Sequence, residues 1–192
     1  MGNAINIKNL CVWPLTSDDT TDLTYGTKTD LANRFMTFVD TPKQNSAKLE
    51  GDGTVIDEYV GKQGGELALN ITSLSAVERV ALFGEKATNG SNAMGKTDLI
   101  PYVCAAFTVE NSDGTVALYK YPKVKLVEQP ISVEQRTEGG VKYSTTSLKD
   151  DYTFTINKSE ARYIMDDLNV TTSSATITAW YATAEYTAPA GA

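Results

Sequence analysis

The chain has 192 residues, a hydrophobic content of 41% and a formal net charge of −7. This size allows one domain with a real core, and the composition is that of a globular protein. The acidic balance argues against nucleic-acid binding through phosphate neutralisation, and the lack of histidine removes the commonest general base and metal ligand. No apolar run reaches the roughly 20 residues of a membrane-spanning helix, and residues 1–13 show no secretory signal.

The usual catalytic and metal-binding patterns are missing from the sequence. Cys11 and Cys104 lack metal-ligand spacing, and the apolar run YVCAAF favours a reduced core residue at Cys104. The glycine-rich GKQGG lacks the context of a phosphate-binding loop. Acidic pairs such as Asp166-Asp167 are better explained as solvated residues than as calcium ligands or a glycosidase pair. We therefore expect no enzymatic activity, no cofactor and no metal site.

The segment 43–63 is long for a plain connection, because loops above about 12–15 residues are uncommon unless functional. An Asp52-Gly53 turn signal interrupts it. It is also too apolar for a free loop, since it contains Val55, Ile56, Tyr59 and Val60. These residues predict an arm that packs on a neighbouring subunit.

A half-buried strand and a short helix are predicted next. Leu67, Leu69 and Ile71 alternate with polar or small residues in GELALNITSL. Ser75 and Glu78 have the spacing of a capping box, and Gly84 suits the left-handed position after a helix, so a helix is predicted over 75–83. Helical spacing places one broad apolar stripe against the body and leaves Leu82 outside it, as a candidate contact with a neighbouring subunit.

Strands and turns dominate the remaining chain. Residues 84–98 indicate an exposed loop, and 101–109 is apolar on both faces, as in a central strand. Asp113-Gly114 predicts a hairpin, and Pro122 predicts a bend or a sheet edge. The C-terminal half adds a hairpin at Gly139-Gly140, a strand at 152–156, a helix within 157–168 and a strand at 175–186.

The order of these features resembles the major tail proteins, or tail tube proteins, of long-tailed phages. The resemblance covers roughly residues 7–187, with further similar segments at 15–33, 101–128 and 143–156. Its most specific part is 41–84, with the NSAKL step, the Asp-Gly turn, the alternating strand and the helix ending in Leu-Phe-Gly.

The resemblance implies one domain over 1–192 with a mainly β fold, a β-sandwich or half-barrel with one short flanking helix. It also implies arms that reach neighbours, at about 1–12 and 43–63. The implied function is structural: hexameric rings stack into a tube through which DNA passes to the host. The expected partners are further copies of the chain, a tape measure protein and a tail terminator. The expected location is the virion tail, after assembly in the bacterial cytoplasm and without membrane binding.

Side chains facing the tube lumen should be acidic or neutral polar, because DNA slides past a wall that does not bind its phosphates. Candidate lumen residues are Glu66, Glu134 and Glu138. The alternative function is a carbohydrate- or cell-surface-binding β-sandwich module. Its candidate sugar platform consists of aromatic residues: Trp13, Tyr119, Tyr121, Trp180 and Tyr181.

Overall fold

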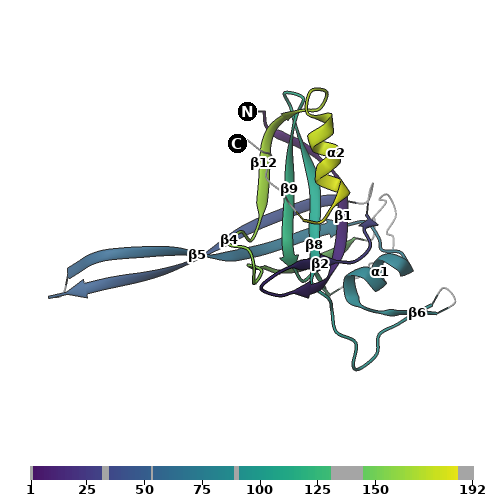
Figure 1. The fold of residues 1–192 in the computed structure, drawn as a ribbon, viewed down its shortest axis with the longest axis horizontal. Helices are drawn as coiled ribbons and strands as arrows, with labels where there is room; N and C mark the ends of the chain where they lie inside the picture. The colour runs from purple at the N-terminus through teal and green to yellow at the C-terminus, as the bar shows by residue number, and fades with distance from the viewer. Residues whose placement is uncertain (1, 32–34, 53, 89–90, 131–144, 186–192) are drawn as a thin grey trace, which may run out of the picture.

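A computed structural model describes residues 2–31, 35–52, 54–88, 91–130 and 145–185. Within these ranges the chain is mainly β, with two short helices (Figure 1). The elements are β1 (Ala4–Asp18), β2 (Leu23–Tyr25), β3 (Thr29–Asp30), β4 (Phe35–Gly51), β5 (Thr54–Ile71), α1 (Ala76–Phe83), β6 (Lys86–Thr88), β7 (Ser91–Ala93), β8 (Val103–Asn111), β9 (Thr115–Val124), β10 (Val127–Glu128), β11 (Thr146–Tyr152), β12 (Tyr163–Asn169) and α2 (Ser174–Ala182).

One large antiparallel sheet contains most of the described strands. Hydrogen-bonded neighbours follow the order β2-β1-β8-β9-β11-β5-β4, while β3 joins β1, β10 joins β11 and β12 joins β9. β11 pairs with β5 along its whole length but meets β9 only where Tyr152 faces Val124. The sheet bends at this narrow junction and brings β4 over β8. Phe38 of β4 therefore packs against Phe107 of β8, with ring centroids 4.8 Å apart. The main core therefore lies between β1-β8-β9 and β11-β5-β4.

The second core lies on the other face of β8 and β9, under α2. Cys104, Leu118 and Trp180 are buried there together. This cover explains why 101–109 is apolar on both faces, and the predicted central strand is confirmed as β8. Lys120 is fully buried beneath α2 and donates to the carbonyl oxygens of Trp180, at 2.7 Å, and Thr183, at 2.9 Å. Its ammonium group thus caps the negative end of the helix dipole.

The last two elements were predicted with the wrong types. The predicted helix within 157–168 overlaps strand β12 instead. A bulge interrupts the apolar residues of β12 between Met165 and Leu168, where Asp167 has a φ of 56°. The bulge inserts an extra residue into the strand, so Met165 and Leu168 are three positions apart, a spacing that resembles that of a helix. The predicted strand at 175–186 overlaps helix α2, whose Ile177, Trp180 and Tyr181 all pack on the second core.

Helix α1 forms where it was predicted, but it turns a different face to the body. Ser75 caps it through a complete capping box with Glu78, and Gly84 ends it with a φ of 68°. Leu82 is fully buried in the main core, whereas Val77 is 71% exposed. The expectation that Leu82 is exposed is therefore wrong, and Leu82 offers no surface to a neighbour.

The other local predictions have mixed outcomes. The Asp113-Gly114 hairpin is confirmed between β8 and β9, where Gly114 has a φ of 82°. Only the first residue of the predicted strand 152–156 belongs to β11. In place of an N-terminal arm at 1–12, the structure has β1 beginning at Ala4 and paired with β8. The Gly139-Gly140 hairpin lies outside the described residues.

Candidate functional site: the projecting hairpin

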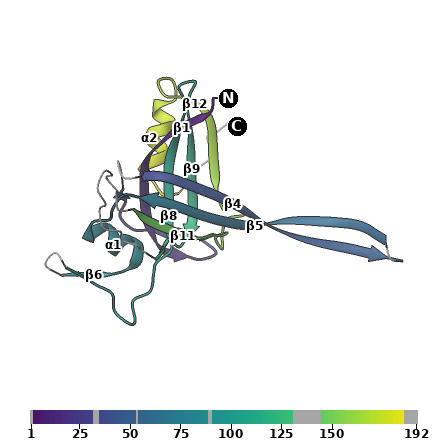
Figure 2. The ribbon, with the colours of Figure 1, turned by 180° about the vertical axis from the view of Figure 1, so that it is seen from behind.

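The longest feature of the molecule is the hairpin formed by β4 and β5. Its ladder runs from the Phe35–Ile71 pair at the body to the Gly51–Thr54 pair at the far end. Figures 1 and 2 show its outer half projecting from the body, on the side opposite α1. This outer half corresponds to the segment 43–63 that the sequence marks as an arm.

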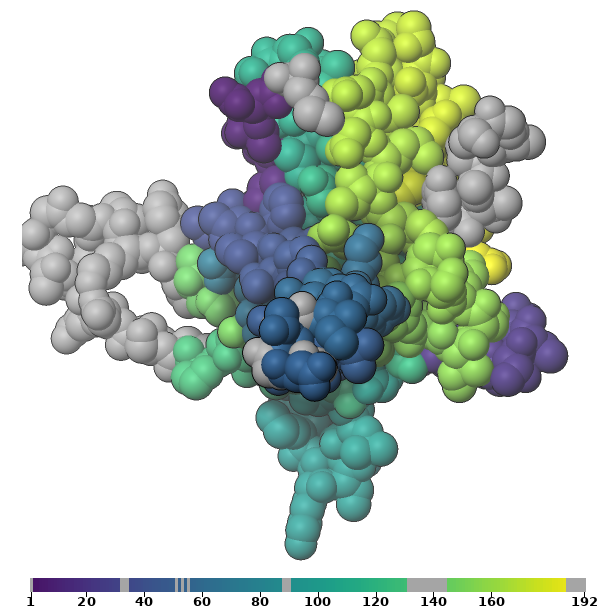
Figure 3. Space-filling model, turned by 90° about the vertical axis from the view of Figure 1, so that its left-hand side faces the viewer, coloured from purple at the N-terminus to yellow at the C-terminus, as the bar shows by residue number. Residues whose placement is uncertain are grey.

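The hairpin tip, defined as residues 46–60, exposes large apolar side chains. Ile56 is 67% exposed, Tyr59 73% and Leu49 61%. Tyr59 lies opposite Ala47 on one face of the hairpin, whereas Val60 lies on the other, because strand side chains alternate. Ile56 lies at a register shift between the Leu49–Asp57 and Glu50–Val55 pairs. Val55 belongs to β5, but its side chain is not among those described. Viewed along the arm, the tip stands in front of the body (Figure 3).

An exposed two-stranded hairpin is at best marginally stable in water, and clustered exposed apolar residues typically mark a contact surface. The tip also carries a clear excess of negative charge. Glu50, Asp52, Asp57 and Glu58 accompany one lysine, Lys48, and all five residues are exposed. The tip therefore suits a partner surface that combines apolar and cationic groups.

A polar network fixes the base of the arm to the body. Asp40 of β4 accepts hydrogen bonds from the hydroxyls of Tyr121, at 2.9 Å, and Tyr152, at 2.8 Å. The Asp40 side chain is only 10% exposed and forms an ion pair with Arg162. Burial, together with the hydrogen bond to Asp40, raises the pKa of Tyr152 to about 12. Burial and the nearby Asp40 also raise the pKa of Tyr121, so both tyrosines remain neutral donors at physiological pH.

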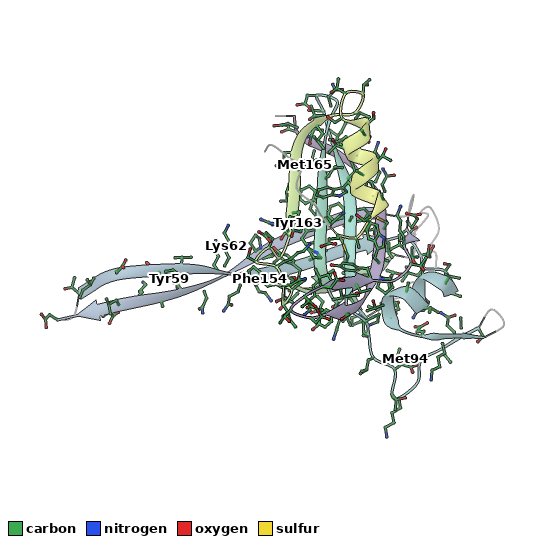
Figure 4. The ribbon with its side chains drawn as sticks, viewed as in Figure 1. Tyr59, Lys62, Met94, Phe154, Tyr163 and Met165 are labelled. Atoms are coloured by element: carbon green, nitrogen blue, oxygen red, sulfur yellow. The ribbon has the colours of Figure 1, made fainter. Side chains whose placement is uncertain are left out.

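Two glycines allow the close packing of this base. A Cβ atom at Gly65 would overlap the hydroxyl and ring of Tyr152, and one at Gly64 would overlap the Tyr152 carbonyl oxygen. Gly64 also has a φ of 101°, which side-chain-bearing residues rarely adopt. The GKQGG motif is thus structural, because Gly64 and Gly65 leave room for Tyr152 to pack against the backbone. A pocket of about 360 Å³ opens beside them, between the arm and the segment 159–162. Lys62 and Phe154 lie at this position in Figure 4.

The outer face of β4, β5 and β11 carries mostly polar side chains and one exposed apolar residue, Val39, and the ion pairs on it are balanced. Glu66 forms an ion pair with Lys149 at 2.9 Å, and Lys43 forms one with Asp151 at 2.5 Å. Asn70 of β5 donates to Thr37 at 2.9 Å. The structure therefore places Glu66 on an outward, partly exposed face, as the alternation predicts, but as one member of an ion pair. Glu134 and Glu138 lie outside the described residues.

The aromatic residues considered for sugar binding do not form an exposed platform. Trp13, Tyr121 and Trp180 are buried. Tyr119 packs on Phe107 in the main core, with ring centroids 5.3 Å apart, and Tyr181 packs against the second core.

The two cysteines are inert core residues. Both are free and buried, and burial raises the pKa of each thiol to about 12. Within the described residues, no group of three or more acidic or cysteine side chains is arranged to hold a metal ion. No helix in the same residues is long and apolar enough to cross a membrane.

A scan against protein-family models and a search of curated proteins both find no match.

Proposed function

We propose that this protein is a structural subunit of a phage tail tube, in which rings of six copies stack around a channel for DNA. The observation that carries the proposal is the projecting hairpin, whose tip exposes apolar side chains on both faces. In a monomer the apolar residues of the arm stay exposed to water, whereas an assembly buries them between subunits. In this proposal the bent sheet is the β-sandwich or half-barrel of the tail tube class, and α1 is its flanking helix.

The end position of β4 in the sheet supports assembly by strand pairing. β4 has a neighbour, β5, on one side only among the described strands, so its second edge is available. Unpaired edges promote association, and a closed ring removes them by pairing each edge with the next subunit. The same proposal assigns β4 and β5 to the wall of the ring.

The outer face of β4, β5 and β11 suits a surface along which DNA moves. Its lysines are matched by carboxylates, through the Glu66–Lys149 and Lys43–Asp151 pairs. Among the described residues of this face, both lysines are paired with carboxylates, and cations that are already paired contribute little to phosphate binding by counterion release. We propose this outer face as the lumen wall, with Glu66 on it, and DNA, a tape measure protein and a tail terminator as partners in the virion.

Electron microscopy of the purified protein tests the proposal directly. Negative staining over a range of protein concentrations should reveal hexameric rings or hollow tubes. A chain that stays monomeric at high concentration, and also when mixed with preformed tail-tip complexes, would contradict it. Weak retention on DNA-cellulose at low salt is a second expected result, and strong retention would contradict a lumen wall of this charge.

A further inference from the structure

A groove of about 540 Å³ lies beside the end of α1, on the side of the molecule away from the hairpin tip (Figure 1). Its apolar lining includes Phe83, Met94 and Ile100. Met94 is 78% exposed, and Leu99, which precedes Ile100 in the chain, is 85% exposed. Figure 4 shows Met94 on this side of the molecule, far from Tyr59 on the arm. Exposed apolar residues that gather around a groove are typical of a contact surface. We call this groove, with its lining residues, the α1 groove.

Among the described residues, the charged side chains that line the α1 groove are all carboxylates: Glu85, Asp98 and Glu128. The Arg79 guanidinium binds two of them, with Nη2 at 2.8 Å from Glu85 and 3.0 Å from Glu128. One positive charge therefore faces two negative charges. The hydrogen bond from Arg79 holds the pKa of Glu85 below its usual range, so this carboxylate is ionised at neutral pH. The groove thus combines an apolar lining with an excess of negative charge.

Glu128 is the carboxylate of this pair that retains free acceptor positions. The Glu85 side chain is only 4% exposed and accepts hydrogen bonds from Nε and Nη2 of Arg79 and, at 2.8 Å, from Asn92. The Glu128 side chain is 20% exposed, and each of its oxygens accepts one hydrogen bond from Arg79 among the described residues, at 3.3 Å and 3.0 Å. A carboxylate oxygen can accept two hydrogen bonds, so Glu128 can bind a further donor. A cationic donor would also balance the excess negative charge.

The two lysines near the α1 groove are not part of its lining. Nζ of Lys86 lies 3.4 Å from Asp98, but the Lys86 side chain is 74% exposed, and ion pairs this exposed contribute little. Lys96 is exposed and lies outside the lining. A ligand inside the groove therefore meets carboxylates and apolar side chains.

We propose that the α1 groove binds a basic, apolar peptide segment of a partner protein, in which an arginine or lysine stands next to an apolar residue. The partner's cation donates to Glu128, and the apolar side chain beside it packs against Met94 and Ile100. Acidic segments are rejected, because they would bring further negative charge to the carboxylates of the groove. The tube proposal gives this surface no role, so the inference goes beyond that proposal and applies to a single copy of the chain.

Nuclear magnetic resonance of the methionine methyl groups tests the inference on the full-length protein, at a concentration where it is monomeric. The probe is a capped peptide that alternates arginine with leucine. Two comparison peptides carry glutamate in place of arginine, or serine in place of leucine. Met94 reports on the groove, whereas Met36, which is 44% exposed on β4, reports on another surface. The probe should shift the Met94 signal saturably and leave Met36 unchanged, and each comparison peptide should bind about tenfold more weakly.

Two pairs of variants locate the contact by isothermal titration calorimetry with the same probe. Glu128→Gln should weaken binding about three- to tenfold, because it removes the charge that pairs with the peptide cation. Glu58→Gln, an exposed acid on the hairpin tip, is its matched control and should leave the affinity unchanged. Met94→Ser changes an exposed residue, so it keeps the fold and should weaken binding about three- to tenfold. Leu49→Ser on the tip is the matched control for this variant.

Each outcome bears on the inference. A Met94 signal that does not move at millimolar probe, or equal shifts of Met94 and Met36, would overturn it. Equally tight binding of the glutamate peptide would overturn the basic character of the partner, and equally tight binding of the serine peptide would overturn its apolar character. Unchanged affinity of Glu128→Gln would overturn the role of Glu128. A Met94 signal that shifts with protein concentration alone would assign the groove to a second copy and overturn the inference. Because the protein is unassembled in this test, failure of the inference leaves the tube proposal standing, and the reverse also holds.

Discussion

The Tyr152 hydroxyl lies 2.8 Å from Oδ1 of Asp40 and joins β11 to β4 where the arm leaves the body. Tyr121 donates to the other carboxylate oxygen of Asp40, so three separate strands converge on one side chain. The arm is therefore anchored to the folded body, and its base is ordered before any partner binds.

Removing this anchor should destabilise the body. Asp40→Ala leaves the hydroxyls of Tyr121 and Tyr152 and the charge of Arg162 without their acceptor, at a cost of about 2–3 kcal/mol. The cost stays below that of a fully buried pair because the Arg162 side chain is 33% exposed. Urea unfolding followed by tryptophan fluorescence measures it. Asp57→Ala on the tip is the control, with an expected change within about 0.5 kcal/mol.

Substitution of Gly65 should destabilise the protein about as much as substitution of Asp40. Gly65→Ala places a methyl group on the ring of Tyr152 and should cost about 1–3 kcal/mol through overpacking. In Gly26→Ala the nearest heavy atom would be 3.7 Å away, an ordinary contact, so this control should change stability little. The Gly65→Ala and Tyr152→Ala effects should not add, because the second variant removes the overlapping ring. If the stability losses of the two variants add in the double variant, the destabilisation by Gly65→Ala does not arise from contact with the Tyr152 ring.

The orientation of α1 can be tested by comparing Leu82 with Val77. Leu82→Ala opens a cavity in the main core and should cost about 2–5 kcal/mol. Val77→Ala lies at an exposed position and should alter stability by less than about 0.5 kcal/mol. Thermal unfolding of the two variants distinguishes this orientation from the one expected from the sequence. A larger loss for Val77→Ala than for Leu82→Ala would contradict the structure.

This helix also illustrates what local sequence can and cannot predict here. Ser75, Glu78 and Gly84 mark the ends of α1, because capping is a contact between near neighbours in the chain. The buried face was predicted wrongly, since it depends on the distant surface that receives the helix. Helical spacing placed Leu82 outside the buried stripe, whereas the structure buries Leu82 and exposes Val77.

The C-terminal errors have a related origin. Ile177, Trp180 and Tyr181 recur at helical spacing and pack on one core, so the signal for α2 was present beneath a composition typical of strands. The arm was recognised by its length and apolar content, but its two strands were not, because both faces of the tip are exposed and no alternation marks them. The Asp40 network joins residues far apart in the chain and has no local signature.

Alkaline pH should weaken the fold through the buried thiols. In the unfolded chain each cysteine ionises near its ordinary pKa of 9.0, whereas burial holds the folded pKa of Cys11 and Cys104 at about 12. Above pH 9 the unfolded state therefore loses protons that the folded state keeps, and stability falls by up to about 1.4 kcal/mol per pH unit for each thiol.

Other groups also titrate at alkaline pH. The contribution of the thiols is therefore measured by comparing the wild type with a variant that lacks both cysteines. Burial lowers the pKa of Lys120, which acts in the opposite direction, and the buried tyrosines lose stability above their own unfolded pKa. A Cys11→Ala/Cys104→Ala variant retains these groups. Its free energy of unfolding, measured in urea between pH 8 and pH 10.5, should fall less steeply than that of the wild type. Parallel pH profiles would show that the thiols do not contribute.

Shortening the arm separates folding from assembly. Replacing residues 46–60 by a two-residue Asn-Gly turn removes the exposed tip and keeps the Asp40 network and both cores. The variant should unfold with the same cooperativity and nearly the same midpoint as the wild type, because the described residues of the tip belong to neither core. It should also fail to form rings or tubes in electron micrographs and should remain monomeric in analytical ultracentrifugation. A full-length variant with Tyr59→Ser and Ile56→Ser tests the apolar contact without changing the length of the arm. It should assemble only at higher concentration, and tubes formed by the shortened variant would show that the arm is not the assembly element.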